Sequence, residues 1–365
     1  MSTQYQLRIY SRTGVLQHVI TDMLQLSYVR EVNAAGMLAV ALPAASSAIL
    51  DLQLDSQVEV WRANVAQGIA WYCDFYGFWR GETRQANDDG TAIYMMQCPG
   101  HLSLLSRPIV AYRAGTNNRS QFALGRAETI AKTLVRYNAT SAGAVADGRV
   151  RNVTLAGISI EADGAQGNDI ELSCAWRNLL DVLADITAIG GGDIDLVKTG
   201  PATWDFCWYP LTRGTDRRGE VVFALERGNI ASPRLVRSHL QERTVAIVAG
   251  QGQEADRTVV VRAGANYAAA YNDAETLVDV RNVSATAALQ GAGDAAMVDQ
   301  RARNELSFTV LQVPQTLYGL HYFLGDLVTA RYETVVATKK INRVAVAVQA
   351  DGSEDITCDL VDAYV

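Results

Sequence analysis

The chain has 365 residues, a formal net charge of −7 and 49% hydrophobic residues. This composition excludes a disordered chain, and the length predicts two or three domains. The acidic balance argues against specific nucleic-acid binding as the main role. The first residues, MSTQYQLRIYSRTG, lack a basic region followed by an apolar one, so no signal peptide is expected. Five scattered cysteines then predict reduced, mostly buried thiols and folding in a cytoplasm.

The first hundred residues read as successive strands. Segments such as YQLRIYS, LQLSYVREV and SQVEVWRA are rich in β-branched and aromatic residues, and Asn87–Gly90 (NDDG) predicts a hairpin turn. We interpret residues 1–112 as a first β-barrel, closed or nearly closed.

An uncharged stretch of 19 residues runs from Val32 to Leu50. Its length would allow a membrane helix, but Pro43 near the middle would break one. We therefore predict a turn over residues 32–36, a strand from Met37 to Leu42 and a short helix capped near Ser46. Membrane insertion is not expected.

Residues 113–235 have the pattern of an α+β insertion. Two helices are predicted, the first in AETIAKTLVRYN and the second in CAWRNLLDVLADITAIG. Ser173 is the expected N-cap of the second helix and Gly190 its C-terminal stop. The residues expected on the buried faces are Ala127, Ile130, Ala131 and Leu134 for the first helix, and Trp176, Leu179, Leu180, Leu183 and Ile186 for the second.

Residues 236–365 return to strands and predict a second β-barrel, with a helical insertion around 263–310 that contains a helix near Asp294–Glu305. Residues 55–98 and 326–358 follow a similar pattern. Each has a strand, a long strand, an Asp-Gly turn and a closing strand with a cysteine, Cys98 or Cys358. The predicted fold class is therefore mainly β with α+β insertions: two β-barrel domains of related design plus insertion domains.

Motifs for catalysis, cofactors or metals are weak. Gly250–Ala255 (GQGQEA) satisfies a dinucleotide pattern, but a strand follows it where phosphate binding needs a helix. Ile189–Asp193 (IGGGD) reads as a helix stop. The four histidines are far apart in the sequence, and no G-x-S-x-G is present. We predict no catalytic, cofactor-binding or metal-binding residues, and no cofactor.

Charged and aromatic clusters allow two readings each. Asp193/Asp195 and Asp181/Asp185 are interpreted as strand-edge or solvated helix-face charges in preference to an acid/base dyad. The segment RGTDRRGE, residues 213–220, predicts a solvated hairpin tip, or alternatively a site for an acidic partner. The aromatic run from Trp71 to Trp79 predicts one long strand with aromatics facing both the core and a partner; a sugar-binding platform is the alternative.

Several phrases in succession resemble a known family. LRIYSRTGVLQHVITDMLQLSYVREVNAAGMLAVALP, CPGHLSLLSRPIV, VAIVAGQGQEADRTVVV and LGDLVTARYETVVATKKINRVAVAV are similar to the tail hub proteins of long-tailed phages, in particular the Gp37-like siphophage family. The resemblance implies two barrels with insertion domains and a homotrimer whose six barrels form a ring. Such a ring docks on the phage tail tube or distal tail protein and carries tip, spike or fibre proteins.

The resemblance implies a structural, non-enzymatic protein of the virion tail tip, made and assembled in the host cytoplasm. A carbohydrate-binding tail-tip protein and a peptidoglycan hydrolase of the tail tip are the alternatives. A trimeric ring needs contacts between barrels of neighbouring subunits. We expect them on two strands whose candidate interface residues are Met37, Val40, Leu42, Trp71, Phe75 and Trp79.

Overall fold

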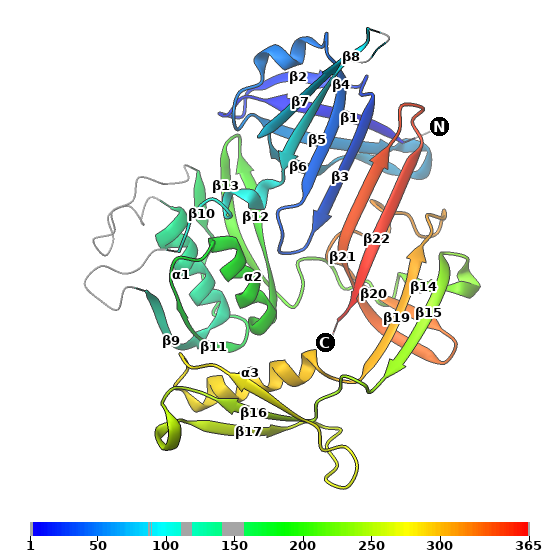
Figure 1. The fold of residues 1–365 in the computed structure, drawn as a ribbon. Coiled ribbons are helices and arrows are strands. Elements are labelled where there is room, and N and C mark those ends of the chain that lie inside the picture. Colours follow the sequence, from blue (N-terminus) through cyan, green and yellow to red (C-terminus); the bar gives the residue numbers. More distant parts are fainter. Residues whose placement is uncertain (1–2, 87, 89, 111–118, 141–156, 364–365) are drawn as a thin grey trace.

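A computed structural model describes residues 3–86, 88, 90–110, 119–140 and 157–363 (Figure 1). The protein is mainly β, as predicted, with several sheets and three α-helices in these ranges. Strands from the two ends of the sequence lie together in the upper right part of Figure 1, and the segments between them form two smaller bodies.

Two large sheets pack face to face around the main core. The first is antiparallel, in the order β2-β1-β5-β6, and the second has the order β14-β20-β21-β3-β4-β8-β7, with β22 also paired to β21. Alternating residues of both sheets, such as Leu7, Val60, Leu38 and Val344, are fully buried between them. The strands of the first sheet are β1 (Gln4–Tyr10), β2 (Leu16–Ile20), β5 (Gln57–Asn64) and β6 (Ile69–Phe78), and those of the second are β3 (Gln25–Glu31), β4 (Met37–Pro43), β7 (Gly81–Ala86), β8 (Ala92–Pro99), β14 (Val222–Ala224), β20 (Leu327–Tyr332), β21 (Val335–Val348) and β22 (Glu354–Asp362).

The two predicted barrels are not confirmed, because no sheet in the described residues closes on itself. The long strand expected through the aromatic run is broken at Trp79 and Arg80. Trp79 N donates to Ser56 O at 2.9 Å and Arg80 N donates to Gln97 O at 3.1 Å, so the chain passes from the first sheet to the second. β6 therefore pairs with β5, while β7 pairs with β8, and a sandwich results.

Strands from distant parts of the sequence share the second sheet. β3 pairs with β21 in antiparallel register from Leu26↔Val348 to Glu31↔Arg343. One sheet thus contains strands from both segments that the sequence assigned to separate barrels. The domain boundaries at 112/113 and 235/236 stay predictions.

The uncharged stretch from Val32 to Leu50 folds as predicted. A turn with Asn33 and Gly36 at positive φ leads into β4, which ends at Pro43. A 3-10 helix, Ser47–Asp51, follows, but the Ser46 side chain makes no capping bond. The apolar side chains of β4 alternate toward the core, and β4 is a central strand of its sheet, which explains the absence of charge.

The middle segment forms a second core in which α1 (Ala127–Ala139) and α2 (Leu179–Gly190) contact each other and the strand pair β12–β13. The predicted face of α1 is buried, which confirms that helix. The Glu128–Lys132 pair, 2.5 Å long, is also buried. Hydrogen bonds replace its lost hydration: Gly164 N and Gln166 N donate to the carboxylate, and Lys132 donates to Ala162 O. The strands of this segment are β9 (Ser120–Arg126), β10 (Ile158–Ile160), β11 (Asp169–Cys174), β12 (Gly192–Gly200) and β13 (Thr203–Pro210).

Helix α2 begins later than the sequence suggested. Ser173 lies in β11, and Trp176 lies outside the helix with φ of 63° and 60% of its surface exposed. Asn178 caps the helix by accepting from Leu180 N at 3.0 Å. The predicted stop is confirmed, since Gly190 is the last helical residue and Gly191 adopts the left-handed conformation.

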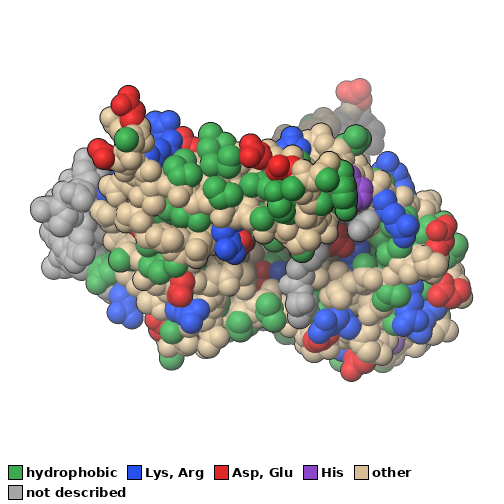
Figure 2. All heavy atoms as spheres, turned by 90° about the horizontal axis from the view of Figure 1, so that it is seen from below, with side chains coloured by type: hydrophobic (Ala, Val, Ile, Leu, Met, Phe, Trp, Pro, Cys, Tyr) green, Lys and Arg blue, Asp and Glu red, His purple; other side chains and the backbone are tan. Residues whose placement is uncertain are grey.

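A third, small core lies under α3 (Thr286–Asp299), which covers one face of the sheet β17-β16-β18. This helix begins eight residues before the predicted Asp294. The other face of the sheet exposes Val259, Val261 and Leu277, and Figure 2 shows hydrophobic side chains on the side of the molecule where it lies. The strands are β16 (Val245–Ala249), β17 (Val259–Ala263) and β18 (Glu275–Asp279), and the two-stranded ribbon β15 (Ile230–Ser238) and β19 (Arg303–Val310) connects this body to the sandwich.

Candidate functional site

The six candidate interface residues have different environments in the chain. Met37 and Trp71 are exposed by 47% and 36%, and Trp79 packs partly against the main core. Val40, Leu42 and Phe75 are buried in that core. β4 lies between β3 and β8, whereas β6 is the last strand of its sheet. The interface itself stays a prediction, and Met37 and Trp71 are the residues of this set that present most surface.

Two β-bulges in β6 disturb the expected alternation. Opposite β5, the register slips once around Asp74 and again where Ala70 and Trp71 face the single residue Ala63. A bulge turns the following side chains to the other face of the sheet. The first bulge places the Asp74 carboxylate in the interior, and the second leaves Trp71 at the surface.

Asp74 is the centre of a buried polar cluster inside the sandwich. Tyr28 OH and Tyr318 OH donate to its carboxylate at 2.5 and 2.7 Å, and Arg30 Nη1 lies 2.6 Å from Oδ1. Burial, together with the negative charge of Asp74, raises the pKa of both tyrosines well above the ordinary value. They therefore stay protonated donors, and the cluster joins β3, β6 and the segment before β20.

A second polar cluster forms around Asp193 and Asp195 of β12, which were interpreted as strand-edge charges. β12 is an edge strand of the sheet β10-β13-β12, as interpreted, but both aspartates are buried, with 1% and 5% exposure. Asp195 accepts from His101 Nε2 and lies beside Arg213 Nη2, each at 2.5 Å. Asp193 lies 2.6 Å from Lys340 Nζ and accepts from Arg213 N at 2.8 Å.

These bonds tie three parts of the sequence together. His101 follows β8, Arg213 follows β13 and Lys340 lies in β21, while the two aspartates belong to the middle segment. The Tyr76 ring stacks on His101 with centroids 4.1 Å apart. The cluster thus fixes the insertion body against both large sheets, which makes it a structural junction.

A cavity of about 240 Å³ adjoins this junction, and several of the charged groups that line it are paired, among them Glu59 and Lys198 at 2.7 Å. Burial alone would raise the pKa of Asp195, but His101 and Arg213 outweigh it and hold that pKa far below the usual value. A general acid needs a carboxyl that keeps its proton near neutral pH. Asp195 has the opposite property, so this geometry favours an ion-pair junction over acid catalysis.

The arginine-rich segment 213–220 is not a solvated hairpin tip. Arg213 contacts Asp195, and Arg217 Nε lies 2.8 Å from Asp326 Oδ2, whose side chain is 3% exposed. Arg218 pairs at the surface with Asp216 at 2.5 Å, and Arg217 also reaches the exposed Glu220 at 3.3 Å. The buried partners are far away in the sequence, so spacing gave no signal for these contacts.

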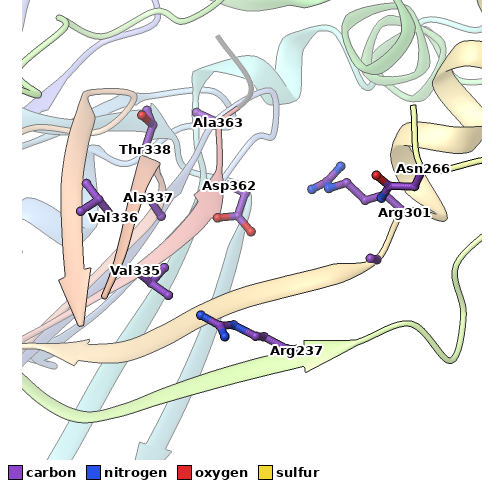
Figure 3. A pocket seen from close by; sticks show the side chains of 10 residues that line it. Arg237, Asn266, Arg301, Val335, Val336, Ala337, Thr338, Asp362 and Ala363 are labelled. Carbon is purple, nitrogen blue, oxygen red and sulfur yellow. The ribbon is translucent and has the colours of Figure 1, made fainter. Parts of the chain in front are cut away.

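An open pocket of about 520 Å³ lies between the β15–β19 ribbon and the C-terminal end of β22 (Figure 3). Figure 3 shows the side chains of Arg237 and Arg301 directed into the space beside Asp362. Lys339 Nζ lies 2.6 Å from Asp362, and the guanidinium groups of Arg237 and Arg301 also line the pocket. Two arginines therefore come together at this surface of a chain whose net charge is −7.

Within the described ranges, no group of three or more His, Cys, Asp or Glu residues is arranged to hold a metal ion. The five cysteines are free, and four are buried, as expected for thiols in a core. None of the helices described has the length and apolar character that crossing a membrane requires.

The model of one protein family, described as Siphovirus ReqiPepy6 Gp37-like protein, matches residues 6–359. The chain belongs to this family. No curated protein matches the chain. The family is a siphovirus family, and the similar solved structures include phage tail proteins, so the resemblance to phage tail proteins is confirmed.

Solved structures with a similar fold include three tail proteins, two of them from prophages. The 43 kDa tail protein of prophage MuSo2 from Shewanella oneidensis is 12% identical, with a TM-score of 0.62 and coverage of 99% of this chain and 98% of that one. A tail protein from Neisseria meningitidis is 11% identical, with a TM-score of 0.62 and coverage of 99% and 96%. Prophage tail protein gp18 from Listeria monocytogenes is 10% identical, with a TM-score of 0.59 and coverage of 99% and 95%. The TM-scores and coverages establish a shared fold over nearly the whole chain.

Proposed function

We propose that this protein is the hub subunit of a phage tail tip, in which three copies form a ring that joins the sixfold tail tube to distal tip, spike or fibre proteins. The family match over residues 6–359 carries the proposal. The fold shared with tail proteins over 99% of the chain supports it. The function of such a hub subunit depends on the surfaces that contact other subunits and other tail proteins.

A pseudo-sixfold ring requires two similar units in each subunit. We assign them to residues 55–98 and 326–358, as the two related units that the sequence suggested. Both are made of strands, and Gly90 and Gly352, in the two Asp-Gly turns, have φ of 81° and 78°. Superposition of the two segments tests the equivalence. Three copies would then supply six units around a threefold axis.

The proposed subunit contact uses the outer face of β4 and β8. Met37, Ala39 and Ala41 point outward on β4, and Met95, 39% exposed, lies opposite Ala41 on β8. Small and flexible apolar side chains permit close packing of another surface. A stable interface of this type buries on the order of 1,600 Å².

Light scattering on the purified chain, with and without the tail-tube protein, tests the assembly. The expected mass is about three times 39.5 kDa. Met37→Glu places a charge in the proposed contact and should shift the mass toward that of one chain. Val19→Glu is the matched control, because Val19 is 50% exposed on the other sheet and should leave the trimer intact. A twofold dimer, or a ring of six copies in an assembled tail tip, would overturn the proposal.

The hydrolase alternative has no support from the described carboxylates. Asp181 and Asp185 are exposed on α2 as predicted, and Asp195 is held ionised. Turbidity of a purified cell-wall suspension should therefore stay constant when the protein is added. A steady fall in turbidity that is lost in Asp195→Asn would restore that alternative.

A further inference from the structure

A pocket of about 400 Å³ opens at one end of the sandwich. It lies where the start of β1, the β21–β22 hairpin and the residue Trp71 of β6 come together, close to the N-terminal end marked in Figure 1. Ligand pockets in proteins commonly have volumes of roughly 300–1,000 Å³, and the mouths of β structures are frequent places for them. The size and position suit a small ligand.

No residue that lines this pocket carries a charge, although 19% of the residues in the chain are charged. Arg62 and Glu354, which both bond the lining residue Tyr5, are paired with each other at 2.8 Å. A charged ligand would therefore lose its hydration without gaining a counter-charge. The lining favours a neutral ligand.

The polar side chains of the lining are amides and hydroxyls. Gln4 and Gln349 each offer a carbonyl oxygen and an NH2 group, Gln6 offers its NH2 group because its carbonyl oxygen accepts from Arg8, and Thr21 offers a hydroxyl that both donates and accepts. Such groups match a ligand with many hydroxyls, each of which is also donor and acceptor. An apolar ligand would leave them unpaired at a cost in free energy.

Trp71 provides a flat apolar wall next to these groups. The bulge of Ala70 and Trp71 opposite Ala63 leaves the indole 36% exposed at the edge of the sheet instead of buried in the core. The C–H face of a pyranose ring stacks on an indole, while its hydroxyls reach neighbouring amides. Met23 adds a second, adaptable apolar surface.

We propose that this pocket binds a neutral oligosaccharide, with Trp71 as the stacking platform and the glutamine amides as hydroxyl partners. The proposal goes beyond the hub function, which needs no sugar site. It also replaces a subunit contact at Trp71, because an indole buried between subunits cannot stack on a sugar. The two roles are therefore distinguishable by experiment.

The test uses the full chain on a glycan array, followed by titration calorimetry with a neutral oligosaccharide that binds and with an acidic oligosaccharide of equal length. Trp71→Ala should weaken binding of the neutral sugar at least tenfold, and Gln349→Ala, in the hairpin, should weaken it several-fold. Trp176→Ala is the matched control, because Trp176 is 60% exposed outside this pocket. Its affinity should stay within twofold of the parent.

Four results would overturn the proposal. They are the absence of any neutral glycan binding on the array, binding of acidic sugars only, equal affinity of the parent with both pocket variants, and loss of the oligomer in Trp71→Ala. The last result would assign Trp71 to a subunit contact. The hub proposal fails separately, through a parent protein that forms a twofold dimer or a ring of six copies.

Discussion

Arg62 Nη2 lies 2.8 Å from Glu354 Oε1, which joins two residues that are 292 positions apart in the sequence. The guanidinium is 3% exposed and also donates to Tyr72 OH at 3.2 Å and Tyr318 O at 3.0 Å. Glu354 in addition accepts from Tyr5 OH. A single side chain of β5 thus connects the first sheet to β22 and to the segment before β20.

Replacing Arg62 by methionine should lower the free energy of unfolding by about 3 kcal/mol, because loss of one partner leaves the other group of a buried ion pair uncompensated. Urea titration followed by circular dichroism measures this change. Arg8→Met is the matched control: Arg8 lies on the neighbouring strand, 3.8 Å from the Trp61 ring centre, at the outer face. Its loss should cost roughly 1 kcal/mol or less. Equal losses in the two variants would show that the buried pair has no special role.

The junction at Asp195 predicts a pH dependence of stability. Despite burial, His101 and Arg213 hold the folded-state pKa of this carboxyl below its unfolded value of about 3.9. A lowered folded-state pKa contributes stability that is fully present above about pH 3.9 and is lost as the pH falls through the folded-state value. Stability of the parent should therefore decline in acid.

Asp195→Asn should destabilise the protein by about 3 kcal/mol at pH 7, and the difference from the parent should shrink steadily below about pH 4. Urea titrations at a series of pH values measure it. Asp185→Asn is the control, because Asp185 is 52% exposed in its pair with Arg177, and should change stability by less than about 1 kcal/mol at every pH. A difference that is constant between pH 7 and pH 2 would contradict this assignment.

Periodic elements were predictable from sequence because each carries its own signal. The buried face of α1 and the strand ending at Pro43 follow from apolar spacing and from the missing proline donor. The start of α2 was misplaced because Trp176 fits the helical spacing. The turn before Asn178, with Trp176 at positive φ, has no such periodic signal.

The junction was not predictable, since its members have no local relation. His101 lies 94 positions before Asp195, and Lys340 lies 147 positions after Asp193. β12 is buried on both faces over its first half, and both of its aspartates are internal. Aspartate is usually exposed, so the sequence alone gives no sign of this burial. β-bulges were not predictable from the sequence either. One extra residue in β6 turns Asp74 toward the interior, whereas strict alternation along the strand predicts another orientation.

The acidic chain should not bind duplex DNA, even if a genome passes through the proposed ring. A net charge of −7 gives no phosphate-neutralising surface of the size that counterion release requires. Fluorescence anisotropy with a labelled duplex at physiological salt should show no binding at micromolar protein. Submicromolar, salt-sensitive affinity would contradict the prediction, and the pocket lined by Arg237 and Arg301 would then be the first surface to mutate.

Helix α3 offers a matched pair of glycines two positions apart. A Cβ at Gly291 would meet nothing within 4 Å, whereas one at Gly293 would lie 2.7 Å from Val248 Cγ2 and 3.0 Å from Arg262 Cγ. Alanine has the higher helix propensity, so Gly291→Ala should stabilise the protein by about 1 kcal/mol. At Gly293 the same gain is outweighed by overpacking against β16, and Gly293→Ala should destabilise by about 1–2 kcal/mol. Thermal unfolding measures both signs, and hydrogen exchange of the β16 amides locates the effect in the small core. Two variants of equal stability would show that α3 does not pack on the sheet through Gly293.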